Sequence, residues 1–175
     1  MNHEHLYCLR ADHVPRPLFH EYSGFIHSLA AATRSSNAGH TVKYALVDSD
    51  PQLSAKPSNK RARLCYTWDK QMVEAADLVV AEGSFPSLGL GIELQMAAAK
   101  DTPIILCFRD FKGENRAPPI DYENPDHTKY HLQIGEGYIS LMALGIPSVS
   151  RVLKYSDPED GIKQVVGAID LLNRG

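Results

Sequence analysis

The residues that could do chemistry gather around one glycine-containing turn. Ser87, Gly89, Gly91 and Glu93 follow an apolar run at residues 77–81 that is typical of a buried strand. Ser87 is a suitable N-cap for a helix that would carry Glu93. The first amides of such a helix form an anion site, and glycines let a ligand approach the backbone closely. The pattern therefore indicates an anion held beside a carboxylate.

Spacing alone leaves the role of Glu93 open. A glutamate near a helix start is favoured by the helix dipole, so a purely stabilising role is the more common interpretation. The glycine pair is not a dinucleotide-binding fingerprint, because its third glycine would fall on Leu94.

The surrounding motif adds a resemblance. Ala-Asp-Leu-Val-Val-Ala-Glu, followed by Pro-Ser-Leu-Gly-Leu-Gly-Ile-Glu-Leu, is similar to the central motif of the nucleoside 2-deoxyribosyltransferase family. The match covers about residues 75–108 and is closer to the branch of 2′-deoxynucleoside 5′-phosphate N-hydrolases. The resemblance implies that Glu93 is a nucleophile and that Ser87, with the amides of Gly89 and Gly91, binds a phosphate. The nucleoside-acting branch usually has aspartate at the position of Ser87.

The same resemblance implies roles for two residues outside the motif. Tyr7, on the first predicted strand, would orient Glu93, although a strand aromatic that only packs is as common. Asp69, eight residues before Asp77, would contact the nucleobase and help protonate it as it leaves. Without the motif, Asp69 would be interpreted as an exposed helix carboxylate.

A third role would need a second copy of the chain. In the phosphate-binding branch, a segment like residues 135–142 reaches across a dimer interface, and Ser140 fits its phosphate-contacting serine. A surface serine on a helix is the simpler interpretation. The resemblance thus implies a homodimer whose sites are completed across the interface.

The chain departs from the family pattern after Tyr7. The family usually has a glycine there, whereas this chain has Cys8, Leu9, Arg10 and Ala11. Either this end of the pocket differs from the family, or the approach is remodelled with Arg10 reaching the phosphate.

The segment at residues 109–132 is longer than the family usually has and lacks clear periodicity. Segments of this kind are usually lids, interface arms or disordered. It contains His127 and His131, which are four residues apart, but no third metal ligand is evident and no metal site is expected. A short basic cluster at Lys56, Lys60, Arg61 and Arg63 is interpreted as solvated surface.

Composition sets the remaining limits. A chain of 175 residues predicts one domain over residues 1–175, and 43% hydrophobic with 22% charged residues is typical of a soluble globular protein. The net charge of -3 argues against a nucleic-acid binder. With neither a membrane-length apolar run nor a signal peptide, a cytoplasmic location is expected. The three cysteines favour buried thiols over disulfides.

The hydrophobic pattern alternates between strands and helices. Strands are predicted near residues 5–10, 42–47, 77–81, 102–108 and 148–153, and helices near 18–30, 64–76, 87–99 and 157–172, with an exposed connection at 48–63. This order predicts a doubly wound α/β domain with a five-stranded parallel sheet in the order 2-1-3-4-5. Its ligand would lie at the carboxyl ends of the first and third strands.

These observations predict a hydrolase that splits 2′-deoxyribonucleoside 5′-monophosphates into base and sugar phosphate without a cofactor. Exchange of nucleobases between sugars is an alternative within the same family. The phosphoribohydrolases that activate cytokinins are disfavoured because their Pro-Gly-Gly turn is absent. A non-catalytic nucleotide-binding module also stays open.

Overall fold

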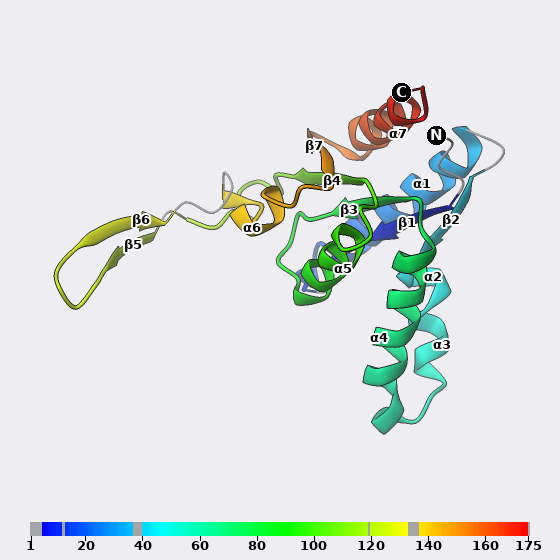
Figure 1. Ribbon diagram of the computed structural model, residues 1–175, viewed down its shortest axis with the longest axis horizontal. Coiled ribbons are helices and arrows are strands. Elements are labelled where there is room, and N and C mark those ends of the chain that lie inside the picture. Colours follow the sequence, from blue (N-terminus) through cyan, green and yellow to red (C-terminus); the bar gives the residue numbers. More distant parts are fainter. Residues whose placement is uncertain (1–4, 12, 37–39, 119, 133–136, 175) are drawn as a thin grey trace.

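A parallel sheet organises the protein. The computed structural model describes residues 5–11, 13–36, 40–118, 120–132 and 137–174. Its sheet has the strand order β2-β1-β3-β4-β7 (Figure 1), with all neighbouring strands parallel. The strands are β1 (His5–Leu9), β2 (Thr41–Tyr44), β3 (Leu78–Glu82), β4 (Ile104–Arg109) and β7 (Val149–Tyr155). The predicted α/β class and strand order 2-1-3-4-5 are confirmed.

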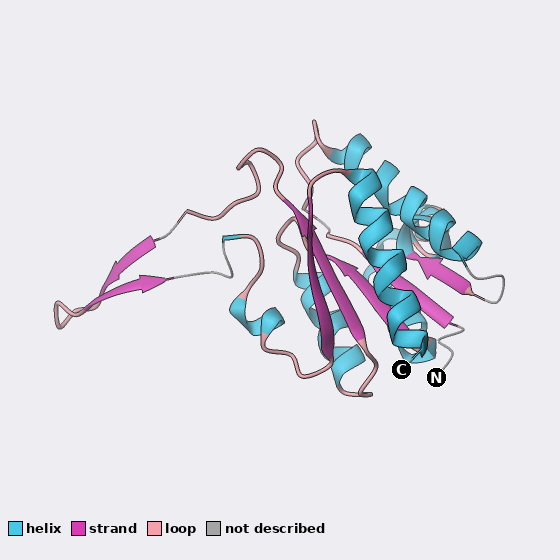
Figure 2. Ribbon diagram, turned by 90° about the horizontal axis from the view of Figure 1, so that it is seen from above, coloured by secondary structure: helices cyan, strands magenta, loops and turns pink. Residues whose placement is uncertain are grey.

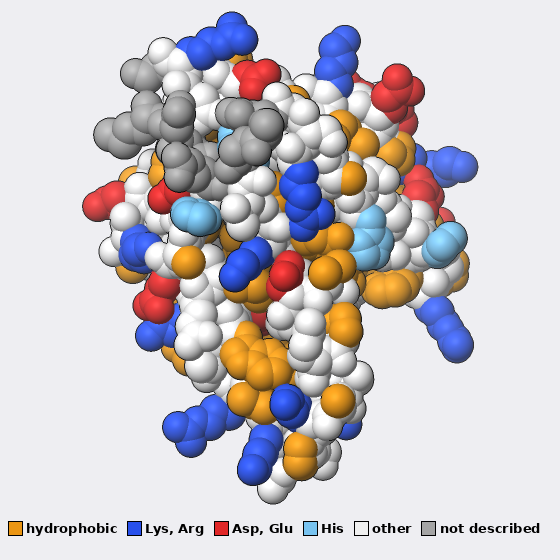
Figure 3. All heavy atoms as spheres, turned by 90° about the vertical axis from the view of Figure 1, so that its right-hand side faces the viewer, with side chains coloured by type: hydrophobic (Ala, Val, Ile, Leu, Met, Phe, Trp, Pro, Cys, Tyr) orange, Lys and Arg blue, Asp and Glu red, His pale blue; other side chains and the backbone are white. Residues whose placement is uncertain are grey.

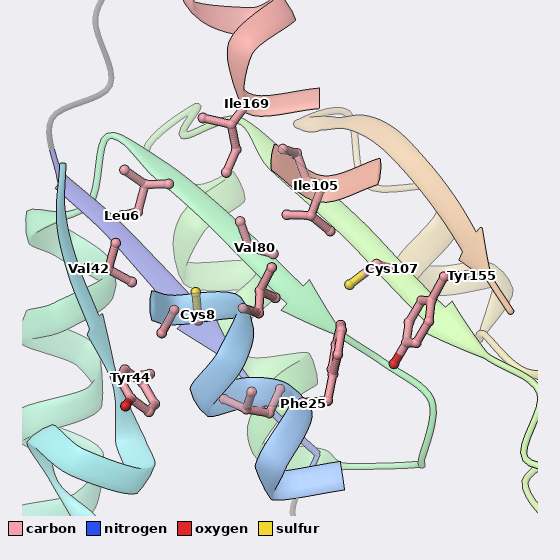
Figure 4. Close-up of a cluster of buried hydrophobic side chains, with 14 of the residues drawn as sticks. Leu6, Cys8, Phe25, Val42, Tyr44, Val80, Ile105, Cys107, Tyr155 and Ile169 are labelled. Atoms are coloured by element: carbon pink, nitrogen blue, oxygen red, sulfur yellow. The ribbon is translucent and has the colours of Figure 1, made fainter. Parts of the chain in front are cut away.

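Helices cover both faces of this sheet (Figure 2). On one face, α1 (Phe19–Ser36) and α7 (Pro158–Arg174) bury a cluster that includes alternate strand residues such as Leu6, Cys8 and Val80 (Figure 4). On the other face, α4 (Ser58–Ala75) and α5 (Leu88–Ala98) pack over Tyr7 and its neighbours. Successive strand residues point to opposite faces, so both clusters are built from the same strands.

The second strand and the segment after it differ from the prediction. The strand expected at 42–47 ends at Tyr44, because the carboxylate of Asp48 accepts a hydrogen bond from the Tyr44 amide at 2.9 Å and turns the chain. Two short helices follow, α2 (Ala45–Asp48) and α3 (Asp50–Ser54), and α4 already begins at Ser58. The segment at 51–63 is largely exposed, as predicted for 48–63, but most of it is helical, which the sequence did not predict because the polar first turns of α4 carry no hydrophobic period.

The segment at 109–132 contains regular structure that its sequence did not predict. Strands β5 (Ile120–Glu123) and β6 (Lys129–Leu132) pair antiparallel and form a hairpin that projects from the body of the protein. The short helix α6 (Leu141–Leu144) follows before β7.

Two further expectations concern membranes and thiols. Within the described residues, no helix combines the length and apolar character that crossing a bilayer requires. All three cysteines are free thiols, and Cys8 and Cys107 are buried as expected.

Candidate active site

The structure brings Tyr7 and Glu93 together. Tyr7 lies in the middle of β1 and is 1% exposed, and its hydroxyl donates a hydrogen bond to Glu93 Oε1 at 3.1 Å. Glu93 is positioned by α5, whose Leu90 and Leu94 are buried in the same cluster as Tyr7. Residues far apart in sequence thus form a tyrosine–carboxylate pair at the α5 face of the sheet.

The environment of Tyr7 keeps its hydroxyl protonated. Burial raises the pKa of Tyr7 far above its ordinary value, and the negative charge of Glu93 raises it further. The phenol therefore acts as a hydrogen-bond donor that orients the Glu93 carboxylate.

Glu93 lies further into its helix than a helix-stabilising acid would. Ser87 is the N-cap of α5, as predicted, and its Oγ accepts a hydrogen bond from the Leu90 amide at 3.1 Å. Since α5 begins at Leu88, Glu93 is in its second turn, and the first turn contains no acidic residue. The helix dipole acts mainly within the first turn, so it gives little reason for a glutamate here.

Asp69 lies near the same tyrosine. The negative charges of Glu93, Asp69 and Asp50 all raise the pKa of Tyr7, so Asp69 lies within electrostatic range of this hydroxyl. Asp69 Oδ2 accepts a hydrogen bond from Cys65 Sγ, one turn earlier on α4, at 3.2 Å. Asp69 also interacts with the hydroxyl of Ser49, which is buried like Asp69 Oδ1.

Asp69 also has a perturbed acidity. Burial raises the pKa of its carboxyl, while the hydrogen bond from Cys65 works in the opposite direction. A carboxyl that keeps its proton to a higher pH than usual is suited to act as a general acid.

Arg10 has a partner that the sequence did not reveal. Its Nη2 lies 2.5 Å from Asp50 Oδ2, and its Nη1 donates to the Ala11 carbonyl at 3.1 Å. The two charged side chains are 17% and 35% exposed, so the ion pair is partly shielded from water. A contact between Arg10 and a phosphate stays a prediction, and any such contact would have to share Arg10 with Asp50.

Sequence reasoning missed both Asp50 and Cys65. Asp50 falls within a segment that was interpreted as an exposed connection, and nothing in its spacing linked it to Arg10. Cys65 stands four residues before Asp69 on one helix, and this i, i+4 spacing was a usable signal.

The turn at the start of α5 leaves room for an anion. The first amides of a helix have no partner within the helix, and a serine hydroxyl can donate as well as accept. A Cβ added at Gly91 would meet no atom within 4 Å, so packing inside the protein does not require glycine there. Gly89, also in the first turn, is half-buried. The Gly91 amide, which was predicted to bind the phosphate, already donates to the Ser87 carbonyl at 3.3 Å, so what Gly91 offers a ligand is room and not a donor.

Ser140 lies on the surface and not in the Tyr7 cluster. It is the N-cap of α6, and its Oγ accepts a hydrogen bond from the Met142 amide at 3.2 Å. The next two residues, Leu141 and Met142, are 61% and 84% exposed. Gly135 and Glu136, at the start of the predicted dimer segment, lie outside the described residues. A role for Ser140 in a neighbouring site stays a prediction.

A hollow lies beside α4, and none of the predicted site residues lines it. This cavity of about 390 Å³ is lined by Lys43, Asp48, Gln52, Lys56, Trp68, Gln71 and Met72. On the face that carries α3 and α4, Figure 3 shows hydrophobic side chains bordered by lysine and arginine.

Of the two hairpin histidines, the structure describes the side chain of His127 only. His127 Nδ1 is 2.9 Å from Glu123 Oε1 and largely exposed, whereas the side chain of His131 is outside the described part of the chain. The described residues contain no group of three histidine, cysteine or carboxylate side chains arranged to hold a metal.

Comparison with known proteins gives a likeness of fold. The chain is similar to the CMP N-glycosidase BcmB of Clostridium botulinum, with a TM-score of 0.55 and 14% identity over 95% of this chain and 98% of that one. It is also similar to a conserved protein from Enterococcus faecalis V583, with a TM-score of 0.52 and 22% identity over 92% and 99% of the two chains. No protein-family model and no curated protein sequence matches the chain.

Proposed function

We propose that this protein cleaves the N-glycosidic bond of 2′-deoxyribonucleoside 5′-monophosphates, with Glu93 as the nucleophile. The observation that carries the proposal is the hydrogen bond from Tyr7 to a half-buried Glu93 whose helix has an open first turn, with Asp69 in electrostatic range of the same hydroxyl. A carboxylate, an orienting phenol and a second carboxyl with raised pKa are the groups that a double-displacement glycosidase needs.

In the first step, the Glu93 carboxylate attacks the anomeric carbon and the bond from this carbon to the base breaks. The sugar becomes an ester of Glu93, through a transition state with oxocarbenium character. The departing base takes a proton from Asp69, whose raised pKa favours the protonated form before the reaction. Tyr7 keeps Glu93 aligned through its hydrogen bond.

In the second step, water attacks the same carbon and releases Glu93. Asp69, now a carboxylate, accepts the proton of this water, so the enzyme returns to its starting state. The products are the free base and deoxyribose 5-phosphate, and the reaction needs no cofactor.

The phosphate would bind at the turn that begins α5. Ser87 and the amide of Gly89 supply neutral donors at the positive end of a helix, which favours an anion, and Gly91 leaves room beside them for the phosphate. In a homodimer, Ser140 of the second chain would add a further hydroxyl. The exposure of Ser140, Leu141 and Met142 supports this arrangement because all three are available to another chain.

The likeness to BcmB, a CMP N-glycosidase, supports the reaction class through the fold that both chains share. Because CMP carries a 2′-hydroxyl, ribonucleotides belong among the substrates to be tested. Transfer of the sugar to a second base is the alternative outcome, since a glycosyl ester can react with either water or a base.

The test is to incubate the purified protein with CMP, the deoxynucleoside monophosphates and the matching nucleosides, and to separate free bases by chromatography. Release of base from deoxynucleotides, with deoxyribose 5-phosphate as the sugar product, is expected. An added free base that appears in a new nucleotide faster than sugar phosphate accumulates would show a transferase. Binding of nucleotides without base release would show a binding module.

Ser87→Ala tests the phosphate subsite. Removing a hydrogen bond to a charged group costs about 1.5 to 3 kcal/mol, so nucleotide use should fall by about tenfold or more. Nucleosides lack the phosphate and should be cleaved at an unchanged rate. An equal loss for nucleotides and nucleosides would remove Ser87 from the phosphate subsite.

A further inference from the structure

Glu82 is a buried carboxylate outside the proposed mechanism. It is the last residue of β3, is 0% exposed and lies directly before the turn that leads to Ser87. Its Oε1 accepts a hydrogen bond from Tyr155 at 3.0 Å and another from Ser84 Oγ, and its Oε2 accepts from the Ser84 amide at 3.2 Å. The carboxylate therefore binds both polar groups that Ser84 can donate.

Ser84 also forms hydrogen bonds with the end of β4 and with the segment that follows it. Its Oγ also accepts a hydrogen bond from the Arg109 amide at 2.8 Å, where β4 ends. Its carbonyl accepts from Asn115 Nδ2 at 2.7 Å. Phe85 follows and packs with its ring 5.5 Å from Tyr22 and 5.0 Å from Phe111, centroid to centroid. The chain from residue 83 to Ser87 is thus fixed at its base through Glu82.

Fold stability alone does not account for a carboxylate in this place. Among the described residues, no lysine, arginine or histidine forms an ion pair with Glu82. Removing a carboxylate from water is costly, and apolar residues of similar size often replace buried charged groups without loss of stability. Burial accordingly raises the pKa of Glu82. An apolar residue could not supply the two carboxylate oxygens that accept hydrogen bonds from Ser84.

We infer that Glu82 is a positioning residue for the phosphate subsite: through Ser84 it holds the turn at 83–87, and with it the N-cap Ser87 and the first amides of α5. The inference rests on the proposed function only for the identity of the ligand. The expected consequence is a subsite whose donors are fixed before the ligand binds.

Two single-atom changes separate this role from a merely structural one. Ser84→Ala removes the hydroxyl that joins Glu82 to the Arg109 amide, whereas Tyr155→Phe removes a hydrogen bond to the same carboxylate oxygen and keeps the Ser84 hydroxyl. Ser84→Ala should raise the KM for nucleotides about tenfold and change kcat less than about threefold, the range for one lost hydrogen bond to a charged group. Tyr155→Phe should change KM less than about twofold while lowering Tm.

Glu82→Gln is the conservative variant. Its carbonyl can still accept from the Ser84 amide, and the hydroxyls of Tyr155 and Ser84 can turn to accept from its amide group. It should therefore keep a KM close to that of the unmodified protein.

Amide hydrogen exchange over residues 84–91 gives a second measurement that needs no substrate. Ser84→Ala should speed exchange there by about tenfold or more, and Tyr155→Phe and Glu82→Gln should not, if the turn opens locally. Unchanged exchange in a folded Ser84→Ala protein, or an equal change in Tyr155→Phe, overturns the inference. An unchanged KM for nucleotides in Ser84→Ala overturns it as well. If no substrate is cleaved by any form, the proposed function fails, and the exchange measurement still decides whether Glu82 positions the turn.

Discussion

Two tyrosine–glutamate pairs lie on opposite faces of the sheet, and their hydrogen bonds are almost the same length. Tyr7 donates to Glu93 Oε1 at 3.1 Å on the α5 face, and Tyr155 donates to Glu82 Oε1 at 3.0 Å on the α1 face. Glu82 is completely buried, whereas Glu93 is half-buried and belongs to a helix with an open first turn. The distance between a phenol and a carboxylate therefore does not identify a reactive group.

The two clusters differ in what surrounds the carboxylate. Around Glu82, both carboxylate oxygens accept hydrogen bonds from the protein itself. Glu93 is half-buried, and the first turn of its helix has open space at Gly91. A fully buried cluster of this kind stabilises the fold, whereas a partly exposed one can be reached by a ligand. The comparison teaches that access, more than pairing, marks the candidate site.

The largest expected effects come from substituting each of the two glutamates separately, since one should govern turnover and the other stability. Glu93→Gln should lower turnover by about 10³-fold or more, because an amide is a poor nucleophile, and should change the free energy of unfolding by less than about 1 kcal/mol. Glu82→Ala should lower the free energy of unfolding by about 3 kcal/mol, because it leaves buried donors unpaired. Base release and urea unfolding measure both. A folded Glu93→Gln protein with turnover within tenfold of the original would remove Glu93 as nucleophile.

Asp69→Asn should have the next largest effect. Loss of a general acid typically costs about 10²- to 10⁴-fold in rate, and the loss should be greatest for bases that need protonation to leave. Rates with a panel of bases against pH are the measurement. In the original protein the rate should fall as pH rises through the raised pKa of Asp69, and this limb should vanish in Asp69→Asn.

The same pKa predicts an effect on stability. Because the pKa of Asp69 is raised in the folded protein, the folded state holds this proton to a higher pH than the unfolded state. The contribution of Asp69 to stability therefore falls as pH rises from its unfolded value, near 3.9, through the folded one. Asp69→Asn should gain stability relative to the original protein above that window. A constant difference in unfolding free energy at all pH values would contradict the raised pKa.

Tyr7→Phe should have a smaller effect on rate. It removes the hydrogen bond to Glu93 and keeps the ring in the core, so kcat should fall by about 10- to 100-fold, the size of one lost hydrogen bond to a charged group. Tyr155→Phe is the matched control from the other cluster, and it should leave kcat unchanged. Equal losses in the two variants would mean that both act through the fold.

The sequence predicted the framework of the fold because strands and helices carry strong hydrophobic periods. The buried runs that became β3 and β4, and the amphipathic helices α1 and α7, were read correctly for this reason. The hydrophobic period does not reveal helices or strands whose residues mostly face water. The start of α4 and the hairpin of β5 and β6 were therefore missed.

The candidate site was predicted in part, for a different reason. The motif around Glu93 resembles a family pattern that also pointed to Tyr7 and Asp69. In the structure, Tyr7 donates a hydrogen bond to Glu93, and Asp69 lies within electrostatic range of Tyr7. Contacts that depend on three-dimensional approach, such as Arg10 with Asp50, have no fixed spacing in the sequence. Burial of a charge has no local signature either, so Glu82 gave no signal although it stands within the motif.

The smallest expected effect concerns Gly91, and it separates the needs of the helix from those of the ligand. An alanine at Gly91 would meet no protein atom within 4 Å, and the same is true of Gly24 in α1. Alanine favours a helix over glycine by about 0.5 to 1 kcal/mol, so both Gly91→Ala and Gly24→Ala should raise the free energy of unfolding. Only Gly91 lies in the turn proposed to hold the phosphate. A methyl group there should push the ligand away and raise the KM for nucleotides by about fivefold, because donors misplaced by a fraction of an ångström bind an anion less well. Urea unfolding and KM measured on the three proteins test this directly. If Gly91→Ala gains stability and keeps its KM, the phosphate does not approach the backbone at this turn, and the anion site must be sought elsewhere along the α5 face.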